Sequence, residues 1–135
     1  MSFIQWQASF DVGVKMIDEQ HQLLVQMIND LHAAMQKGED RGVLEKMISR
    51  LGVYAAMHFA REEHYFDSYA YPDREAHIKA HDDFEDQVNR FEQDFKAGKQ
   101  DLSMDVMGFL SNWLVTHITK TDRKFGPFLN ARGIN

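Results

Sequence analysis

The stretch at residues 44–62, LEKMISRLGVYAAMHFARE, decides the fold. Its apolar residues recur every three or four positions, which predicts a helix with one buried face. That face continues through His58 and Phe59 to Glu62. His58 and Glu62 are four positions apart, so they lie about 40° apart around a helix and about 6 Å apart along it. The spacing predicts a long helix over about 41–68 whose buried face ends in a pair of metal-binding side chains.

The same periodicity predicts three further helices over about 18–37, 74–96 and 103–120. Gly38 and Gly98 end two of them, and Pro72 marks a turn. Residues 1–17 are expected to form an ordered N-terminal arm, and Asp18 is the expected N-cap of the first helix. Gly126-Pro127 is expected to break the chain before a short closing turn or helix at 127–132. The pattern is typical of an all-α, up-down-up-down four-helix bundle in a single domain, 1–135.

Composition excludes several classes of protein. The 135 residues suit one domain, and the net charge of −6 argues against a nucleic-acid partner. Cysteine is absent, which excludes disulfides, iron–sulfur clusters and thiol catalysis. The N-terminal residues do not read as a signal peptide, and no apolar run is long enough to span a membrane. We therefore expect a cytoplasmic protein.

Each predicted helix also supplies at least one histidine near the same end of the bundle. His77 and His81 are four apart on the third helix, and His21 lies near the start of the first. His117 and Asp122 are five apart, about 140° in an ideal helix, so Asp122 requires a last turn that loosens. In an antiparallel bundle these ends share one level, and the side chains are predicted to meet there.

The candidate set is five histidines and two carboxylates: His21, His58, Glu62, His77, His81, His117 and Asp122. Such ligands without sulfur favour iron, with manganese, cobalt or zinc as alternative occupants. Seven ligands are too many for one ion. Two ions that share two bridging carboxylates and an oxygen bridge would divide the histidines as three and two. The second ion is then left with an open position for a small diatomic ligand.

This spacing resembles the hemerythrin family, and in particular the single-domain bacteriohemerythrins. The flanking residues agree with that resemblance at Val12-Gly13-Val14, Ile17-Asp18-Glu19-Gln20-His21, Tyr71-Pro72, Trp113-Leu114-Val115-Thr116-His117-Ile118 and Phe125-Gly126-Pro127-Phe128-Leu129. The resemblance covers nearly the whole chain.

The resemblance implies reversible O2 binding at a non-haem di-iron centre, for oxygen storage, transport or delivery, and no catalytic residue. It assigns His77, His81 and His117 to one iron, and His21 and His58 to the iron with the open position. Glu62, Asp122 and an oxo or hydroxo group would bridge the two ions. The implied O2 pocket is apolar, and its residues are Leu24, Phe59, Trp113, Leu114 and Ile118.

Other functions remain open at this point. One is a di-iron sensor of O2, NO or redox state, another is a peroxidase-like oxidase, and a third is metal storage. Ferritin-like enzymes use two Glu-x-x-His motifs, and this sequence has none, which favours reversible binding. The expected ligands are O2, or NO and other small molecules. The protein is expected to be a monomer, with a client enzyme as a possible partner.

Several polar residues near the candidates are expected to have no part in the site. A lone inward histidine is more often a core residue than a ligand, so the set carries the hypothesis. His32 and His64 are expected at the surface. Helix phase indicates solvated charges at Glu19, Glu63, Asp82 and Asp83, with a supporting role behind a ligand as the alternative.

Overall fold

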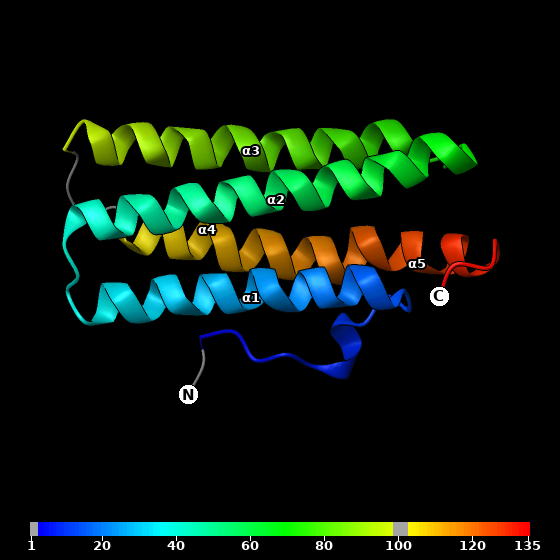
Figure 1. Ribbon diagram of the computed structural model, residues 1–135, viewed down its shortest axis with the longest axis horizontal. Helices are drawn as coiled ribbons and strands as arrows, with labels where there is room; N and C mark the ends of the chain where they lie inside the picture. Colours follow the sequence, from blue (N-terminus) through cyan, green and yellow to red (C-terminus); the bar gives the residue numbers. More distant parts are fainter. Residues whose placement is uncertain (1–2, 99–102) are drawn as a thin grey trace.

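The computed structural model describes residues 3–98 and 103–135, and its regular elements there are all helical. Four long helices lie side by side (Figure 1), and the predicted four-helix bundle is confirmed. The last helix is prolonged by a π-helix and a short terminal helix. The elements are α1 (Lys15–Gln36), α2 (Arg41–Tyr69), α3 (Arg74–Lys96), α4 (Ser103–Thr116), the π-helix η2 (His117–Asp122) and α5 (Arg123–Asn130).

Local chemistry explains where the long helix α2 starts and stops. Asp40 is its N-cap, and the Asp40 carboxylate accepts a hydrogen bond of 3.1 Å from the backbone N–H of Val43. Ala70 ends the helix in the left-handed conformation, with φ of 52°, just before Tyr71 and Pro72. Because proline disfavours helix at the residue before it, the chain turns here and α3 returns antiparallel to α2.

The first helix begins earlier than the sequence predicts. α1 starts at Lys15 rather than Asp18, so the arm ends at residue 14 instead of 17. Asp18 does not cap the helix, because its carboxylate accepts hydrogen bonds from the backbone N–H groups of Val12 (2.8 Å) and Gly13 (3.3 Å). The side chain therefore fastens the arm to the first turn of α1.

The described part of the arm, residues 3–14, lies along the bundle beside α1 (Figure 1). It contains one turn of 3-10 helix, Ala8–Phe10. Ile4 and Asn29 exchange two hydrogen bonds, of 2.7 and 2.9 Å, between the Ile4 backbone and the Asn29 amide. Trp6 is partly buried, and its ring meets Phe10 edge-on at 5.3 Å.

Gly126 and Pro127 were expected to break the chain, but the structure shows no break there. Both lie inside α5, which starts at Arg123 and ends at Asn130. A Cβ added at Gly126 would overlap the backbone carbonyl of Val12. Gly126 is therefore required because the arm packs closely against α5. From sequence alone, a glycine with this packing role looks the same as a glycine that ends a helix.

Two apolar clusters fill the bundle. The larger runs along the four long helices and includes Phe59. The smaller joins the arm, the α2–α3 turn and α5, and consists of Val12, Val14, Ile17, Phe66, Tyr71, Phe125 and Leu129. Phe59 stacks on His81 at 4.0 Å and Phe66 lies 4.6 Å from His77, so the candidate ligands lie between the clusters. No helix in the described residues is both long and apolar enough to cross a membrane.

Candidate metal centre

The seven candidates from the sequence are brought together inside the bundle. They come from α1, α2, α3 and η2, and each is at most 4% exposed. Within residues 3–98 and 104–135, the polar and charged residues that are fully buried are these same seven. A polar cluster this isolated in an apolar core needs compensating partners.

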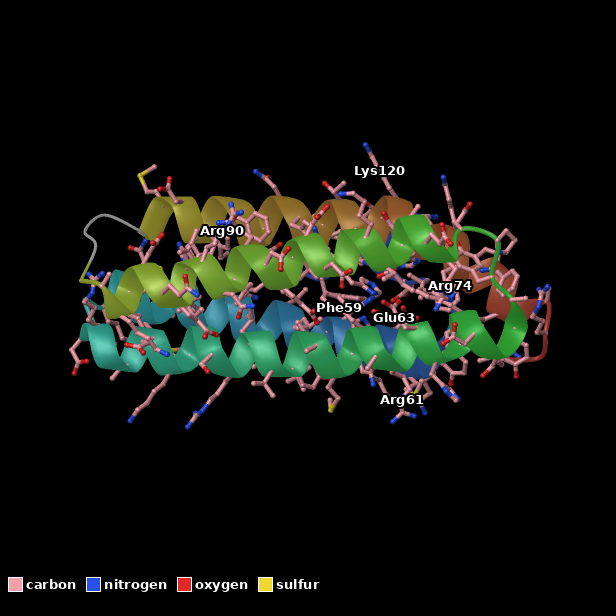
Figure 2. All side chains as sticks on the ribbon, turned by 90° about the horizontal axis from the view of Figure 1, so that it is seen from above. Phe59, Arg61, Glu63, Arg74, Arg90 and Lys120 are labelled. Atoms are coloured by element: carbon pink, nitrogen blue, oxygen red, sulfur yellow. The ribbon has the colours of Figure 1, made fainter. Side chains whose placement is uncertain are left out.

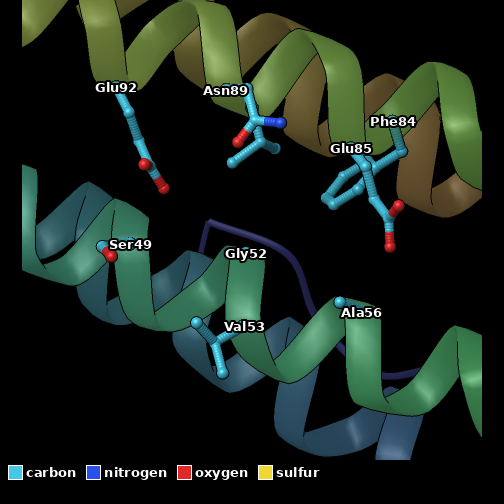
Figure 3. A pocket seen from close by; sticks show the side chains of 9 residues that line it. Ser49, Gly52, Val53, Ala56, Phe84, Glu85, Asn89 and Glu92 are labelled. Carbon is cyan, nitrogen blue, oxygen red and sulfur yellow. The ribbon is translucent and has the colours of Figure 1, made fainter.

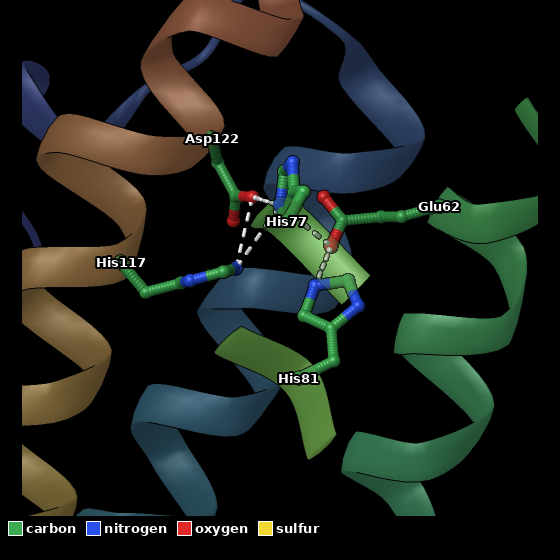
Figure 4. Close-up of side chains that lie close together, drawn as sticks. All are labelled: Glu62, His77, His81, His117 and Asp122. Atoms are coloured by element: carbon green, nitrogen blue, oxygen red, sulfur yellow. Dashed lines mark hydrogen bonds and ion pairs between the residues drawn. The ribbon is translucent and has the colours of Figure 1, made fainter. Parts of the chain in front are cut away.

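Asp122 holds one side of the cluster. Its Oδ1 lies 2.7 Å from Nε2 of His77 and 3.1 Å from Nε2 of His117, and its Oδ2 lies 2.9 Å from Nε2 of His21. Figure 4 shows the first two of these contacts. One carboxylate therefore faces histidines from three helical elements, with its two oxygens directed to different sides.

Glu62 holds the opposite side. Its Oε1 lies 3.1 Å from Nε2 of His81, 3.4 Å from Nε2 of His58 and 4.0 Å from Nε2 of His77. Figure 4 shows Glu62 reaching from α2 toward the α3 histidines. The two carboxylates thus stand on either side of the same group of histidine nitrogens.

The ligand atoms form two overlapping sets, and within each set all atoms lie within 4.8 Å of one another. One set has three histidines and the other has two, while both carboxylates belong to both sets. The sets are Glu62, His77, His81, His117 and Asp122, and His21, His58, Glu62 and Asp122. Each set could hold a metal ion, and the two carboxylates are common to both sets.

The loosened last turn takes the form of a π-helix. In η2 the repeat is i to i+5 instead of i to i+4, and the element runs from His117 to Asp122. An α-helix would point Asp122 away from His117, whereas the wider π turn brings them onto the same side. Their side chains accordingly approach to 3.1 Å.

Unpartnered polar atoms test whether the residues fit metal ions. Eight buried side-chain atoms in the described residues lack a hydrogen bond, and all belong to the candidate set. Six of them are histidine Nε2 or carboxylate oxygen atoms of His21, His58, Glu62, His81 and Asp122. Even the 2.9 Å approach of His21 to Asp122 makes no hydrogen bond. Such atoms are costly in a core unless cations bind them, so the site fits two metal ions.

His58, His81 and His117 are neutral at ordinary pH. Burial, together with the neighbouring histidines, lowers the pKa of His58 to about 3 and that of His81 to about 2. Burial also lowers the pKa of His117. Neutral imidazole has a lone pair free for a metal, so these rings need no deprotonation before they bind one.

The pKa values of the two carboxylates shift in opposite directions. Burial alone would raise the pKa of Asp122, but the adjacent rings of His117, His21 and His77 hold it well below its usual range. Burial, and then the charge of Asp122, raise the pKa of Glu62 well above its usual range. Glu62 therefore lacks a positive partner that a bound cation would supply.

Two residues, Gln20 and Glu63, lie behind candidate ligands. The Nδ1 of His58 lies 2.6 Å from Oε1 of Gln20, and the Nδ1 of His81 lies 3.0 Å from Oε2 of Glu63. For Glu63 the sequence favoured a solvated charge, and the contact with His81 agrees with the alternative of a supporting role. Gln20 was not singled out as a supporting residue. The available signal was that each directly adjoins a candidate ligand in sequence, His21 or Glu62.

Apolar and aromatic side chains cover the cluster. Phe59 lies parallel to His81, and Trp113 lies parallel to His117 at 4.3 Å. The residues predicted for an O2 pocket differ in exposure: Trp113 is partly buried, whereas Leu24, Phe59, Leu114 and Ile118 are at most 3% exposed. Phe59 and Trp113 also meet each other, at 5.7 Å.

Cavities near the cluster open to the surface. One of about 530 Å³ is lined by Trp113, Thr116 and His117 among others, so solvent reaches the outer edge of the His117 ring. Another of about 330 Å³ lies between α2 and α3 (Figure 3), and its lining includes Gly52 and Val53 of α2 and Asn89 and Glu92 of α3. None of the seven candidates lines this second cavity.

The two remaining histidines lie outside the cluster, as expected. His64 is exposed, and His32 is partly exposed with its ring stacked on Phe3 at 4.3 Å. They provide matched surface histidines for substitution experiments.

Comparison with known proteins identifies the relatives of this chain. The family model "Hemerythrin HHE cation binding domain" matches residues 12–129. Bacteriohemerythrin from Pseudomonas aeruginosa is 36% identical over 122 residues, covering 90% of this chain and 78% of that protein. Bacteriohemerythrin from Methylococcus capsulatus is 33% identical over 132 residues, covering 97% and 100%. A solved wild-type hemerythrin superposes with a TM-score of 0.87 at 32% identity, covering 93% of this chain and 97% of that one.

Proposed function

The chain belongs to the hemerythrin family, and on that premise we propose that it binds O2 reversibly at a di-iron centre for oxygen storage, transport or delivery. Hemerythrin-family proteins are generally O2-binding proteins rather than enzymes. The expected ligands are O2, and also NO or other small molecules that fit an open metal position.

The unequal division of the buried histidines carries this proposal. His77, His81 and His117 would hold one iron, and His21 and His58 the other. Glu62 and Asp122, which belong to both sets of ligand atoms, would bridge the ions together with an oxo or hydroxo group. Since one iron would receive one histidine fewer than its neighbour, it keeps a position for a small ligand.

A pair of iron ions, when bound, supplies the reversible electron exchange with O2 that amino-acid side chains lack. The chain contributes the surroundings. Leu24, Leu114 and Ile118 are nearly fully buried, and we propose that they line the O2 pocket with Phe59 and Trp113. An apolar wall admits O2 and excludes water and acids, which favours release of O2 over its irreversible reduction.

The proposal is tested by reversible oxygenation. The protein is loaded with ferrous iron without air, its iron is counted, and its absorption spectrum is followed as O2 is added and then removed with argon. We expect two irons per chain and a coloured form that reverts. Irreversible oxidation, or turnover with a reducing substrate, would overturn the proposal in favour of an oxidase or peroxidase.

Two variants of α2 assign the signal to the proposed site. His58→Ala removes a proposed ligand of the open iron, so the coloured form should be lost. His64→Ala makes the same chemical change at an exposed position of the same helix, and reversible binding should be unchanged. Equal behaviour of the two variants would contradict the assignment of His58.

A further inference from the structure

We propose that Gln20 and Glu63 are positioning residues that hold the outer nitrogens of His58 and His81, and that their different charge makes the two metal positions unequal. This inference rests on the proposed function, because it assigns His58 and His81 to different ions. It adds a neutral support behind the two-histidine position and an acidic support behind the three-histidine position.

The geometry is the same in both pairs. The acceptor oxygen lies 2.6 Å from Nδ1 of His58 in one pair and 3.0 Å from Nδ1 of His81 in the other. Both rings point their Nε2 atoms toward Glu62, at 3.4 and 3.1 Å. In each ring, therefore, one nitrogen faces the cluster and the opposite nitrogen faces a support.

These contacts fix which nitrogen of each ring carries the proton. A carboxylate oxygen can only accept a hydrogen bond, and the Gln20 oxygen likewise accepts, so Nδ1 must be the donor in both rings. The lone pair is then left on Nε2, which faces the cluster. Gln20 and Glu63 thus select the tautomer that can bind a metal and hold the ring plane in place.

The two pairs repeat across neighbouring helices. Gln20 precedes His21 on α1 and reaches His58 on α2, while Glu63 follows Glu62 on α2 and reaches His81 on α3. Figure 2 shows Glu63 in the space between α2 and α3. A residue next to a ligand on one helix therefore supports a ligand on the following helix.

The supports differ in charge, and this difference has a chemical consequence. A carboxylate draws the Nδ1 proton more strongly than an amide does, so the Nε2 of His81 becomes the better electron donor. Solvent weakens the effect of the Glu63 charge on His81, because the Glu63 side chain is 32% exposed. The metal at the three-histidine position is expected to bind more tightly and, when iron, to be harder to reduce.

Cobalt binding tests the inference without O2. Co²⁺ is added to the metal-free protein in competition with a chelator, and the two binding constants are read from absorption. We expect E63Q, which keeps an acceptor but loses the charge, to weaken the tighter step by about 10–100-fold. Q20E should instead strengthen the weaker step.

Asp83→Asn is the matched control. Asp83 is exposed on α3, two positions after His81, and pairs with Lys79 at 3.1 Å. D83N removes the same charge without touching a ligand, so both constants should stay as in the unchanged protein. Equal effects of E63Q and D83N, or weakening of binding by Q20E, would overturn the inference.

The reduction potential provides a second readout. A simple loss of packing would not shift the potential in opposite directions in E63Q and Q20E. In the iron-loaded protein, E63Q should raise the potential of the one-electron step and Q20E should lower it. A tenfold change in the preference for ferric over ferrous iron corresponds to about 59 mV. Shifts of the same sign in both variants would refute the charge effect. Failure of O2 binding would leave the cobalt result unaffected, so the two proposals are tested separately.

Discussion

Replacing Glu62 with methionine should change stability in opposite directions with and without metal. Glu62 is fully buried, and neither of its carboxylate oxygens makes a hydrogen bond. Methionine has a similar unbranched shape and no polar group to satisfy. In the metal-free protein, E62M therefore removes a costly buried polar group and should stabilise the fold by about 1–3 kcal/mol, which is the usual cost of burying such a group without hydrogen bonds.

The metal-loaded protein should respond in the other direction. There Glu62 would be a shared ligand of both ions, so E62M should weaken metal binding. Six unpartnered ligand atoms, at about 1–3 kcal/mol each, represent about 6–18 kcal/mol. That amount matches the whole stability of a typical domain, about 5–15 kcal/mol. Loss of a bridging ligand should remove several kcal/mol of it.

Urea denaturation of four samples measures both effects: the unchanged protein and E62M, each with and without metal. Asp122→Asn is the contrasting variant, because Asp122 accepts hydrogen bonds from His77 and is held ionised by the histidines. D122N should destabilise both forms. Equal destabilisation of both forms by E62M would refute the reasoning, since Glu62 would then be an ordinary structural residue.

Three further predictions concern the ligands, the arm and pH. His117→Ala should bind fewer than two irons per chain by elemental analysis and lower the melting temperature, because metal binding and folding are coupled; two irons in this variant would contradict the ligand set. Gly126→Ala should destabilise by about 1–3 kcal/mol or more in urea, since backbone must move to admit its Cβ, whereas Gly108→Ala, with open space around it, should not. The metal-free protein should lose stability as pH falls below about 6.5, because His58 and His81 have lower pKa values in the folded than in the unfolded chain, which therefore binds more protons. Circular dichroism melts should show a loss of about 1.4 kcal/mol per pH unit for each histidine. A flat stability profile between pH 6.5 and 4 would exclude this cause.

Helix periodicity was enough to predict the bundle and the common level of the candidate ligands. His58 with Glu62, and His77 with His81, follow the four-residue spacing of an α-helix, and the structure brings both pairs to the same cluster. The spacing of His117 and Asp122 conflicted with that rule. The conflict predicted a loosened turn, but the length and type of the π-helix depend on contacts of Asp122 with other helices.

The errors share a physical cause, which is contact between distant segments. The role of Gly126 is visible only with the Val12 carbonyl beside it. Asp18 was read as a helix cap, whereas its carboxylate holds the arm that precedes it. Glu63 was assigned by its phase on its own helix, but its partner His81 lies on the next one. The sequence of one helix does not show which residues of another segment its side chains contact.

Asp122 also determines when metal can be acquired during the life of the protein. It lies 2.9 Å from His21 in space but 101 positions later in the chain, and both sets of ligand atoms include it. At roughly 5–20 residues per second, synthesis of that interval takes roughly 5–20 s. During this time the growing chain adds the other histidines one by one, but it can complete neither set until Asp122 is made. Metal loading therefore follows synthesis instead of accompanying it.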